Sequence, residues 1–205
     1  MNMKRLDLKK EFRDLYAPSA RDVEIVKVPR LSFLMIDGKG DPNLSPGFPL
    51  SVQALYAAAY TLKFMIKKDL SIDYPVMGLE GLWWADDLEV FTMERRDDWK
   101  WTLMIMQPSL VTKARVKKAL AVAMEKKGLE SLQGIRLEPY AEGLAVQIMH
   151  IGPYASEGPT IEKLHSFAAE RGLTLSGKHH EIYLSDPRKV SPGKMKTVLR
   201  QPVRK

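Results

Sequence analysis

The same order of predicted elements occurs twice along the chain, and this repetition constrains the fold more than any other feature. Two strand-like runs, a glycine-containing loop, an amphipathic helix and two further strands fill residues 23–107 and again residues 135–203. Short matches keep the same order: Met35–Gly38 with Met149–Gly152, Leu82–Asp86 with Ile182–Asp186, and Gln107-Pro108 with Gln201-Pro202. We therefore expect an internal duplication.

Two copies of a helix packed on a small antiparallel sheet should pair pseudo-symmetrically. We predict an α+β fold with one domain over residues 23–205, preceded by a helical lead over residues 1–22. Half 1 spans residues 23–107, a connecting helix spans 112–127, and half 2 spans 135–203. The two sheets are expected to flank a central ligand groove.

Hydrophobic periodicity assigns the individual elements. Helices are predicted over 4–16, 51–69, 112–127 and 159–171. Strands are predicted over 23–28, 31–37, 78–86, 99–106, 135–138, 144–150, 179–185 and 198–203, with turns at Pro29-Arg30 and 140–143. Asp186-Pro187 is expected to end the strand 179–185.

Composition excludes several classes of function. The chain has 205 residues, no cysteine and no apolar segment long enough for a membrane span, which predicts a cytoplasmic protein without disulfides or thiolate metal sites. No cofactor or metal is expected, because the loop 38–43 lacks phosphate-binding patterns and the histidines show no metal-ligand spacing. The net charge of +7 is interpreted as a solvated basic surface, with no direct nucleic-acid partner and no membrane partner. The sequence does not predict an oligomeric state.

The strand 179–185 places two chemically useful groups on one face. Alternation puts His179, Glu181 and Tyr183 on one side, and His180 and Ile182 on the core side. A carboxylate among aromatic rings either stays charged and binds a cation, or has its pKa raised by desolvation. In the second case Glu181 is able to activate water while Tyr183 donates to a developing negative charge.

Aromatic residues and methionines elsewhere provide apolar, polarizable surface for a ligand. Tyr56 and Tyr60 lie four residues apart beside the buried stripe of helix 51–69, where they either shield the edge of the core or line a cavity. One of Trp83 and Trp84 is expected in the core and the other outside it. The candidate ligand-binding residues are Tyr56, Tyr60, Trp83, Trp101, Met149, Tyr154, Glu181 and Tyr183.

Three segments, HHEIYLSDPRKVSPGKMKTVLRQPV, QIMHIGPYASE and YPVMGLEGLWW, resemble the GyrI-like small-molecule-binding family, which includes the effector-binding domains of multidrug-sensing transcription regulators. The resemblance runs from about residue 20 to the C-terminus. It implies a duplicated α+β fold with a groove for bulky aromatic, often cationic, compounds, and it places the groove glutamate at Glu181. Many members also carry a DNA-binding extension, and we do not expect one in this chain, which argues against a regulator role in cis.

Some stand-alone members of the family hydrolyse the cyclopropane rings of DNA-alkylating natural products with glutamate and aromatic pocket residues. The resemblance assigns those roles to Glu181, Tyr183 and the tryptophans of the 83–101 region. Three functions stay open at this point. The chain is a xenobiotic-binding protein, a hydrolase of cyclopropanoid electrophiles, or an interaction protein that responds to a small molecule. Whether it is an enzyme is left undecided by the sequence.

Overall fold

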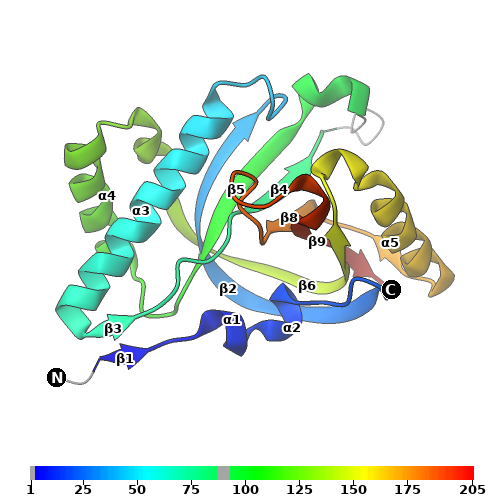
Figure 1. The fold of residues 1–205 in the computed structure, drawn as a ribbon, viewed down its shortest axis with the longest axis horizontal. Coiled ribbons are helices and arrows are strands. Elements are labelled where there is room, and N and C mark those ends of the chain that lie inside the picture. The colour runs from blue at the N-terminus through cyan, green and yellow to red at the C-terminus, as the bar shows by residue number, and fades with distance from the viewer. Residues whose placement is uncertain (1–2, 87–92) are drawn as a thin grey trace. The chain divides into compact units, whose positions relative to one another are not determined.

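The computed structural model describes residues 3–86 and 93–205, which form two compact units (Figure 1). The first unit comprises Met1–Glu11, Leu31–Met77 and Trp84–Tyr140, and the second comprises Phe12–Arg30, Gly78–Trp83 and Ala141–Lys205. Two long strands, β2 (Glu24–Lys39) and β6 (Arg136–Ile151), contribute residues to both units. Each unit combines helices with antiparallel strands, so the predicted α+β class is confirmed.

The first unit contains an antiparallel pair of strands and two long helices. The end of β2 pairs with β5 (Lys100–Gln107), from Ser32 opposite Gln107 to Lys39 opposite Lys100. The other elements are β1 (Lys4–Arg5), α1 (Leu8–Glu11), α3 (Gly47–Leu70), β3 (Ile72–Asp73), η2 (Met93–Asp98), α4 (Lys113–Lys127) and η3 (Glu130–Gly134). Thr112 is the N-cap of helix α4, where its side chain accepts a hydrogen bond from the Arg115 N–H, and Gly128 in the left-handed region caps the C-terminal end.

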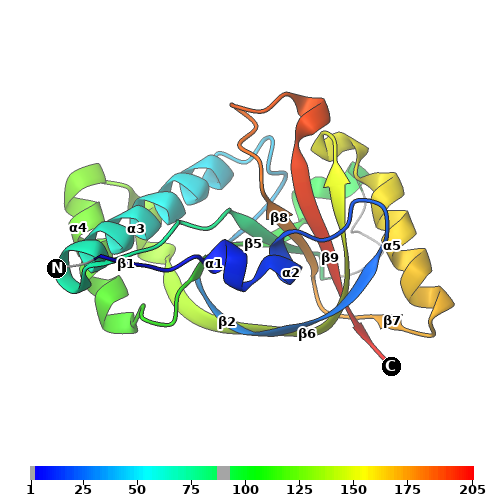
Figure 2. The same cartoon turned by 60° about the horizontal axis from the view of Figure 1, so that its bottom comes forward.

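In the second unit, α5 (Gly158–Glu170) packs on antiparallel strands. The strands are β4 (Glu80–Trp84), β8 (His179–Tyr183), β9 (Lys196–Arg204) and the end of β6; the smaller elements are α2 (Arg13–Tyr16), η4 (Tyr154–Ser156), β7 (Thr174–Leu175) and η5 (Pro192–Lys194). Leu164 and Ala168 of α5 are buried with Val146, Ile148 and Leu199. Both ribbon views show α5 beside β9 (Figure 1 and Figure 2).

The predictions of two interrupted strands were wrong. Residues 24–39 form the single strand β2, and residues 136–151 form the single strand β6. Pro29 fails to end β2 because the fixed φ of proline is also compatible with extended backbone. In β6, Gly143 adopts a φ of +78°, a local distortion that the strand accommodates without ending.

The predicted helix over residues 4–16 was also wrong. Residues 4–5 form a strand, and the helical residues are divided between α1 and α2. Phe12 has φ −108° and ψ 34°, outside the helical region, so the backbone hydrogen-bond ladder is interrupted there. The helices predicted over 51–69, 112–127 and 159–171 are present as α3, α4 and α5, with ends that differ by a few residues.

The internal duplication stays a prediction, and the pairing register of strands β4 and β8 is consistent with it. Strands β4 and β8 pair antiparallel with Gly81 opposite Glu181, the two positions that the sequence matches make equivalent. If a two-fold axis relates β4 to β8, it passes between two paired residues that are equivalent to each other, as Gly81 and Glu181 are in the sequence matches.

No helix within the described residues has the length and hydrophobicity that crossing a membrane demands.

Trp101 is a core residue of the first unit. Its side chain is 2% exposed, contacts Phe48 edge-to-face at 5.3 Å between ring centroids, and lies over Gly38. A Cβ at position 38 would overlap the Trp101 ring. Glycine therefore allows β2 and the indole to approach this closely.

Replacing Gly38 with alanine should lower the free energy of unfolding by about 1–3 kcal/mol, because the added methyl group forces the buried Trp101 ring to move. Urea denaturation of both proteins measures the difference. Gly47→Ala is the matched control: its Cβ meets nothing closer than Ser45 Oγ at 3.7 Å, and alanine favours the helix that begins there. Equal losses in the two variants would contradict the proposed role of Gly38.

Candidate functional site

The strands of the second unit present two chemically different faces. His180 pairs with Leu82 and with Arg200, and Arg200 pairs with Gln147. Glu181 pairs with Gly81 and with Leu199. Because paired residues share a face and neighbours alternate, two sets result. We call them the His180 face (Glu80, Leu82, Gln147, Met149, His180, Arg200) and the Glu181 face (Gly81, Trp83, His179, Glu181, Tyr183, Thr197).

The Glu181 face holds a hydrogen-bonded chain of three side chains. The indole N–H of Trp83 donates to Tyr183 Oη at 3.1 Å, and Tyr183 Oη donates to Glu181 Oε2 at 2.7 Å. The ring of Tyr154 meets that of Tyr183 edge-to-face, with centroids 5.5 Å apart. The Glu181 side chain is 17% exposed, so its carboxyl group is largely surrounded by protein.

Gly81 provides the room for this chain. A Cβ there would lie 2.7 Å from Trp83 Nε1 and 3.2 Å from Tyr183 Oη, inside the space that the hydrogen bond occupies. The strand position opposite Glu181 therefore has to be small for Trp83 and Tyr183 to meet. The sequence matches aligned these two aromatic residues, and the structure brings them into contact.

A second carboxyl group, Glu157, joins the site from the residue that precedes α5. It is 5% exposed, and its Oε1 atom has no hydrogen-bond partner among the described residues. Sequence reasoning missed Glu157, although Pro159 had marked the start of the helix. Proline marks the start of the helix, but nothing in the local sequence shows that the acidic residue before it is buried.

The two carboxyl groups hold protons more strongly than ordinary glutamates. Burial raises the pKa of Glu181 to about 7, even though the hydrogen bond from Tyr183 and the charge of His180 act in the opposite direction. Burial, together with the charge of Glu181, raises the pKa of Glu157 to about 8. One of the two therefore carries a proton near neutral pH while the other is charged.

The neighbouring His179 is neutral under these conditions. Burial has the largest effect on its pKa, and together with the charges of His165 and His180 it lowers this pKa to about 4. Its Nε2 atom lies 3.6 Å from Glu181 Oε1, beyond a normal hydrogen bond. His179 thus forms no ion pair with Glu181 at neutral pH, and it does not neutralise the charge of that carboxylate.

The His180 face contains a buried network of charges. His180 Nε2 lies 3.0 Å from Glu80 Oε2, and its Nδ1 lies 3.1 Å from both Glu142 oxygens. Arg200 donates to Glu142 Oε2 at 3.1 Å, and Tyr16 Oη donates to Glu80 Oε1 at 2.6 Å. All four charged side chains are at most 3% exposed.

The same network fixes the segment around α2. Arg200 donates to the backbone oxygen of Leu15 at 2.6 Å and to Gln147 Oε1 at 3.0 Å. Gln147 in turn donates to the backbone oxygen of Asp14 at 2.6 Å. Arg200 is therefore not part of the solvated basic surface that the net charge suggested, since it is 2% exposed and hydrogen-bonded.

The structure brings together four of the eight predicted ligand-binding residues, namely Trp83, Tyr154, Glu181 and Tyr183. Met149 pairs with Val198 and lies on the His180 face, away from the Glu181 carboxyl group. Trp101 is in the core of the first unit, and Tyr56 and Tyr60 lie on its helix α3.

The structure is an α+β fold with a pair of buried carboxyl groups, and comparison with known proteins identifies its family. The sequence model of the GyrI-like small molecule binding domain matches residues 21–204. The chain therefore belongs to the GyrI-like family of small-molecule-binding domains, as the sequence motifs indicated. No relative was found among the curated proteins.

Several solved structures are similar over almost the whole chain. An uncharacterized conserved protein from Listeria innocua is 42% identical, with 97% of this chain and 100% of that chain covered and a TM-score of 0.90. A protein from the same organism described as a hydrolase is 41% identical, with 98% and 100% covered and a TM-score of 0.87. The C-terminal domain of EcmrR, at 13% identity, 90% and 98% coverage and a TM-score of 0.57, shares the fold alone.

The buried network predicts a histidine that stays protonated well above neutral pH. Although burial opposes its charged form, Glu142 and Glu80 raise the pKa of His180 from 6.5 to about 9. Because the folded pKa is the higher one, the stabilisation is complete below the unfolded value and is lost as pH rises through about 9. The expected loss is about 3 kcal/mol for this group.

NMR of histidine-labelled protein checks the prediction directly, because the chain has only four histidines. One imidazole should titrate near pH 9, and urea denaturation should show a lower free energy of unfolding above that pH than at pH 6.5. If all four imidazoles titrate below pH 8, the charged state of the network is refuted.

Proposed function

We propose that this protein is a hydrolase that adds water to strained, electrophilic rings of hydrophobic small molecules, with cyclopropane-containing DNA-alkylating compounds as the substrate class. One observation carries the proposal: Glu181 and Glu157 are neighbouring buried carboxyl groups with pKa values of about 7 and about 8. An acid and a base with separated pKa values near neutrality are what proton-transfer catalysis needs. The similarity to Listeria innocua proteins described as hydrolases supports it.

In the proposed reaction, the Glu181 carboxylate takes a proton from water as the water oxygen forms a bond to a ring carbon. The ring C–C bond breaks, and its electron pair moves to the electron-accepting group of the substrate, such as a conjugated carbonyl. That group receives a proton from Glu157, the carboxyl group with the higher pKa. The product is the substrate plus one water, and proton exchange with solvent restores both glutamates.

Tyr183 and Trp83 orient the reacting groups through hydrogen bonds. Tyr183 donates to the Glu181 carboxylate, and once Glu181 accepts a proton that hydroxyl becomes available to stabilise the negative charge on the substrate. The hydrogen bond from Trp83 fixes the orientation of the phenol. The rings of Trp83, Tyr154 and Tyr183 provide flat apolar surface for an aromatic substrate.

A second candidate is a protein that binds bulky aromatic or cationic compounds without converting them. The observation in its favour is that one carboxylate of the pair stays charged beside aromatic rings, an arrangement that attracts cations. The two functions share the Glu181 face and differ only in whether water is activated there.

Glu181→Gln separates the two functions. For the hydrolase, ligand affinity measured by tryptophan fluorescence should change by no more than a few fold, while turnover falls by about a hundredfold or more because the base is missing. Mass spectrometry detects the product, which is heavier than the substrate by one water. Glu162→Gln, at an exposed position on α5, is the matched control and should leave both quantities unchanged.

A panel of cyclopropane-containing alkylators and planar cations should be tested with both variants. Binding without any hydrated product in the unmodified protein would overturn the hydrolase proposal. A loss of affinity for cations alone in Glu181→Gln would favour the binding function.

Tyr183→Phe should move the pH profile as well as lower the rate. The Tyr183 hydrogen bond lowers the pKa of Glu181, so its removal raises that pKa and shifts the acidic limb of kcat/KM to higher pH. We expect turnover to fall by about ten- to a hundredfold. A pH–rate profile measured on both proteins tests the shift, and an unchanged acidic limb with full activity would exclude Tyr183 from the mechanism.

A further inference from the structure

Helices α3 and α4 of the first unit line an open groove with a volume of about 550 Å³. Its walls include Tyr56, Tyr60, Phe64 and Met65 from α3, Val122 from α4, and Leu129 beyond the end of α4. A volume of this size is typical of sites for small organic ligands. The sequence left open whether Tyr56 and Tyr60 shield the core or line a cavity, and the groove favours the second interpretation.

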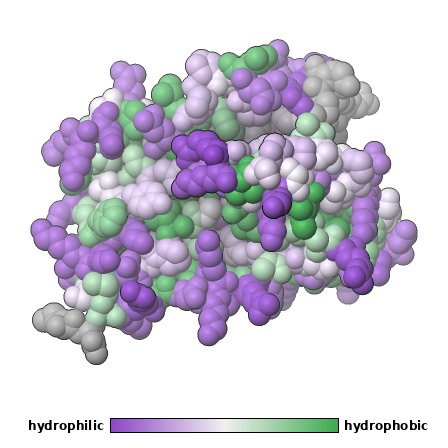
Figure 3. All heavy atoms as spheres, viewed as in Figure 1, coloured by the Kyte–Doolittle hydropathy of each residue, from purple (hydrophilic) through white to green (hydrophobic). Residues whose placement is uncertain are grey.

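The exposed rings of α3 are not required for its packing. Its buried stripe consists of Ala54, Leu55, Ala58, Ala59, Leu62 and Ile66. Tyr60 and Phe64 lie beside that stripe and are 47% and 59% exposed. Their rings are stacked with centroids 6.3 Å apart, and Tyr56 continues the row 6.4 Å from Tyr60. Hydrophobic residues are visible among hydrophilic ones over α3 and α4 (Figure 3).

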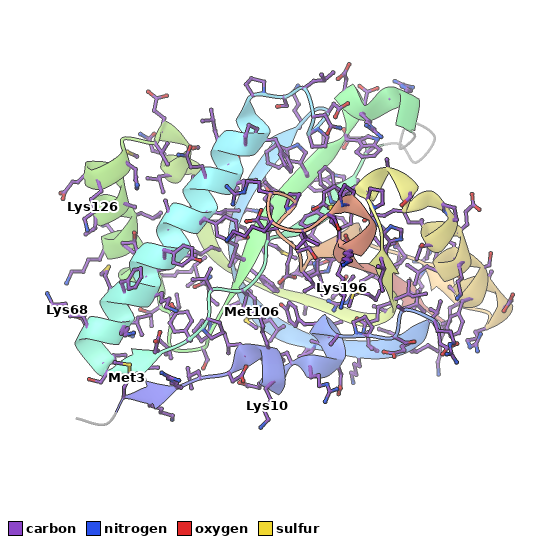
Figure 4. All side chains as sticks on the ribbon, viewed as in Figure 1. Met3, Lys10, Lys68, Met106, Lys126 and Lys196 are labelled. Carbon is purple, nitrogen blue, oxygen red and sulfur yellow. The ribbon has the colours of Figure 1, made fainter. Side chains whose placement is uncertain are left out.

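All charged residues that line the groove are lysines. They are Lys68, in the last turn of α3, and Lys126 and Lys127, in the last turn of α4. Figure 4 labels Lys68 and Lys126 on their respective helices. No carboxylate lines the groove, and within residues 3–86 and 93–205 none of the three lysines forms an ion pair at 4.0 Å or less. The groove thus combines aromatic walls with uncompensated positive charge.

We propose that this groove is a second ligand site, specific for small aromatic anions. The flat body of the ligand lies against the Tyr60 and Phe64 rings, and its anionic group is bound by Lys126 and Lys127. This charge preference is opposite to that of the Glu181 face, whose charged group is a carboxylate. The site belongs to the first unit and is independent of the proposed hydrolase activity.

Titration of the full chain with 1-anilinonaphthalene-8-sulfonate, followed by its fluorescence, tests the charge part of the proposal. Lys126→Glu/Lys127→Glu should weaken binding about tenfold or more, because two attractive charges become repulsive. Lys117→Glu/Lys118→Glu changes the net charge equally at exposed positions of α4 outside the groove, and should change affinity less than about twofold. Equal effects of the two double variants, or no effect of either, would overturn the proposal.

N-Phenyl-1-naphthylamine tests the aromatic part, because it keeps the ring system and lacks the sulfonate. Its affinity should be insensitive to Lys126→Glu/Lys127→Glu, whereas Phe64→Ser should weaken both dyes. Leu44→Ser is the matched control, since Leu44 is 77% exposed in the same unit and outside the groove. If Phe64→Ser and Leu44→Ser behave alike for both dyes, the rings of α3 are not a ligand site.

Discussion

The buried charges around His180 are the interaction on which the second unit depends. Two carboxylates, an imidazolium and a guanidinium are removed from water, which is costly unless each finds a partner. Here the charges balance, and Arg200 extends the pairing to backbone oxygens near α2. A shift of β8 by one residue would place His180 on the other face, so that Glu80 would lose its cationic partner and Glu142 would keep only Arg200. The network therefore fixes the register that places Glu181 beside Trp83 and Glu157.

Alternation along β8 gives adjacent residues opposite environments. His180 is held as a cation by carboxylates, whereas Glu181 meets aromatic rings on the other face. The two faces still interact: burial raises the pKa of Glu181, whereas the hydrogen bond from Tyr183 and the charge of His180 on the other face lower it. The resulting pKa of about 7 is a balance between these effects. A site that relied on burial alone would hold its proton too firmly to serve as a base near neutral pH.

Local patterns predicted helices α3, α4 and α5, strand β8 and the family, because period and turn residues are read over short windows. They failed where proline or glycine sits inside a long strand, at Pro29 and Gly143. They also failed for Tyr16, Glu142 and Arg200, whose partners lie 38 to 185 residues away in the sequence and meet only in the folded unit. Glu157 was missed because its importance arises from burial, which the local sequence does not reveal.

The pairing of Gly81 with Glu181 explains why the centre of the β4–β8 strand pair holds only one acid. A glutamate at both positions would place two carboxyl groups opposite each other, and the side chain at position 81 would displace the Trp83–Tyr183 hydrogen bond. With glycine there, the aromatic pair closes over one side of Glu181, and the second carboxyl group comes from the start of α5 instead. The two acids then differ in their surroundings, Glu181 receiving a hydrogen bond from Tyr183 and Glu157 leaving one oxygen without a partner among the described residues. In the proposed mechanism, Glu181, which has the lower pKa, is the base and Glu157 is the acid.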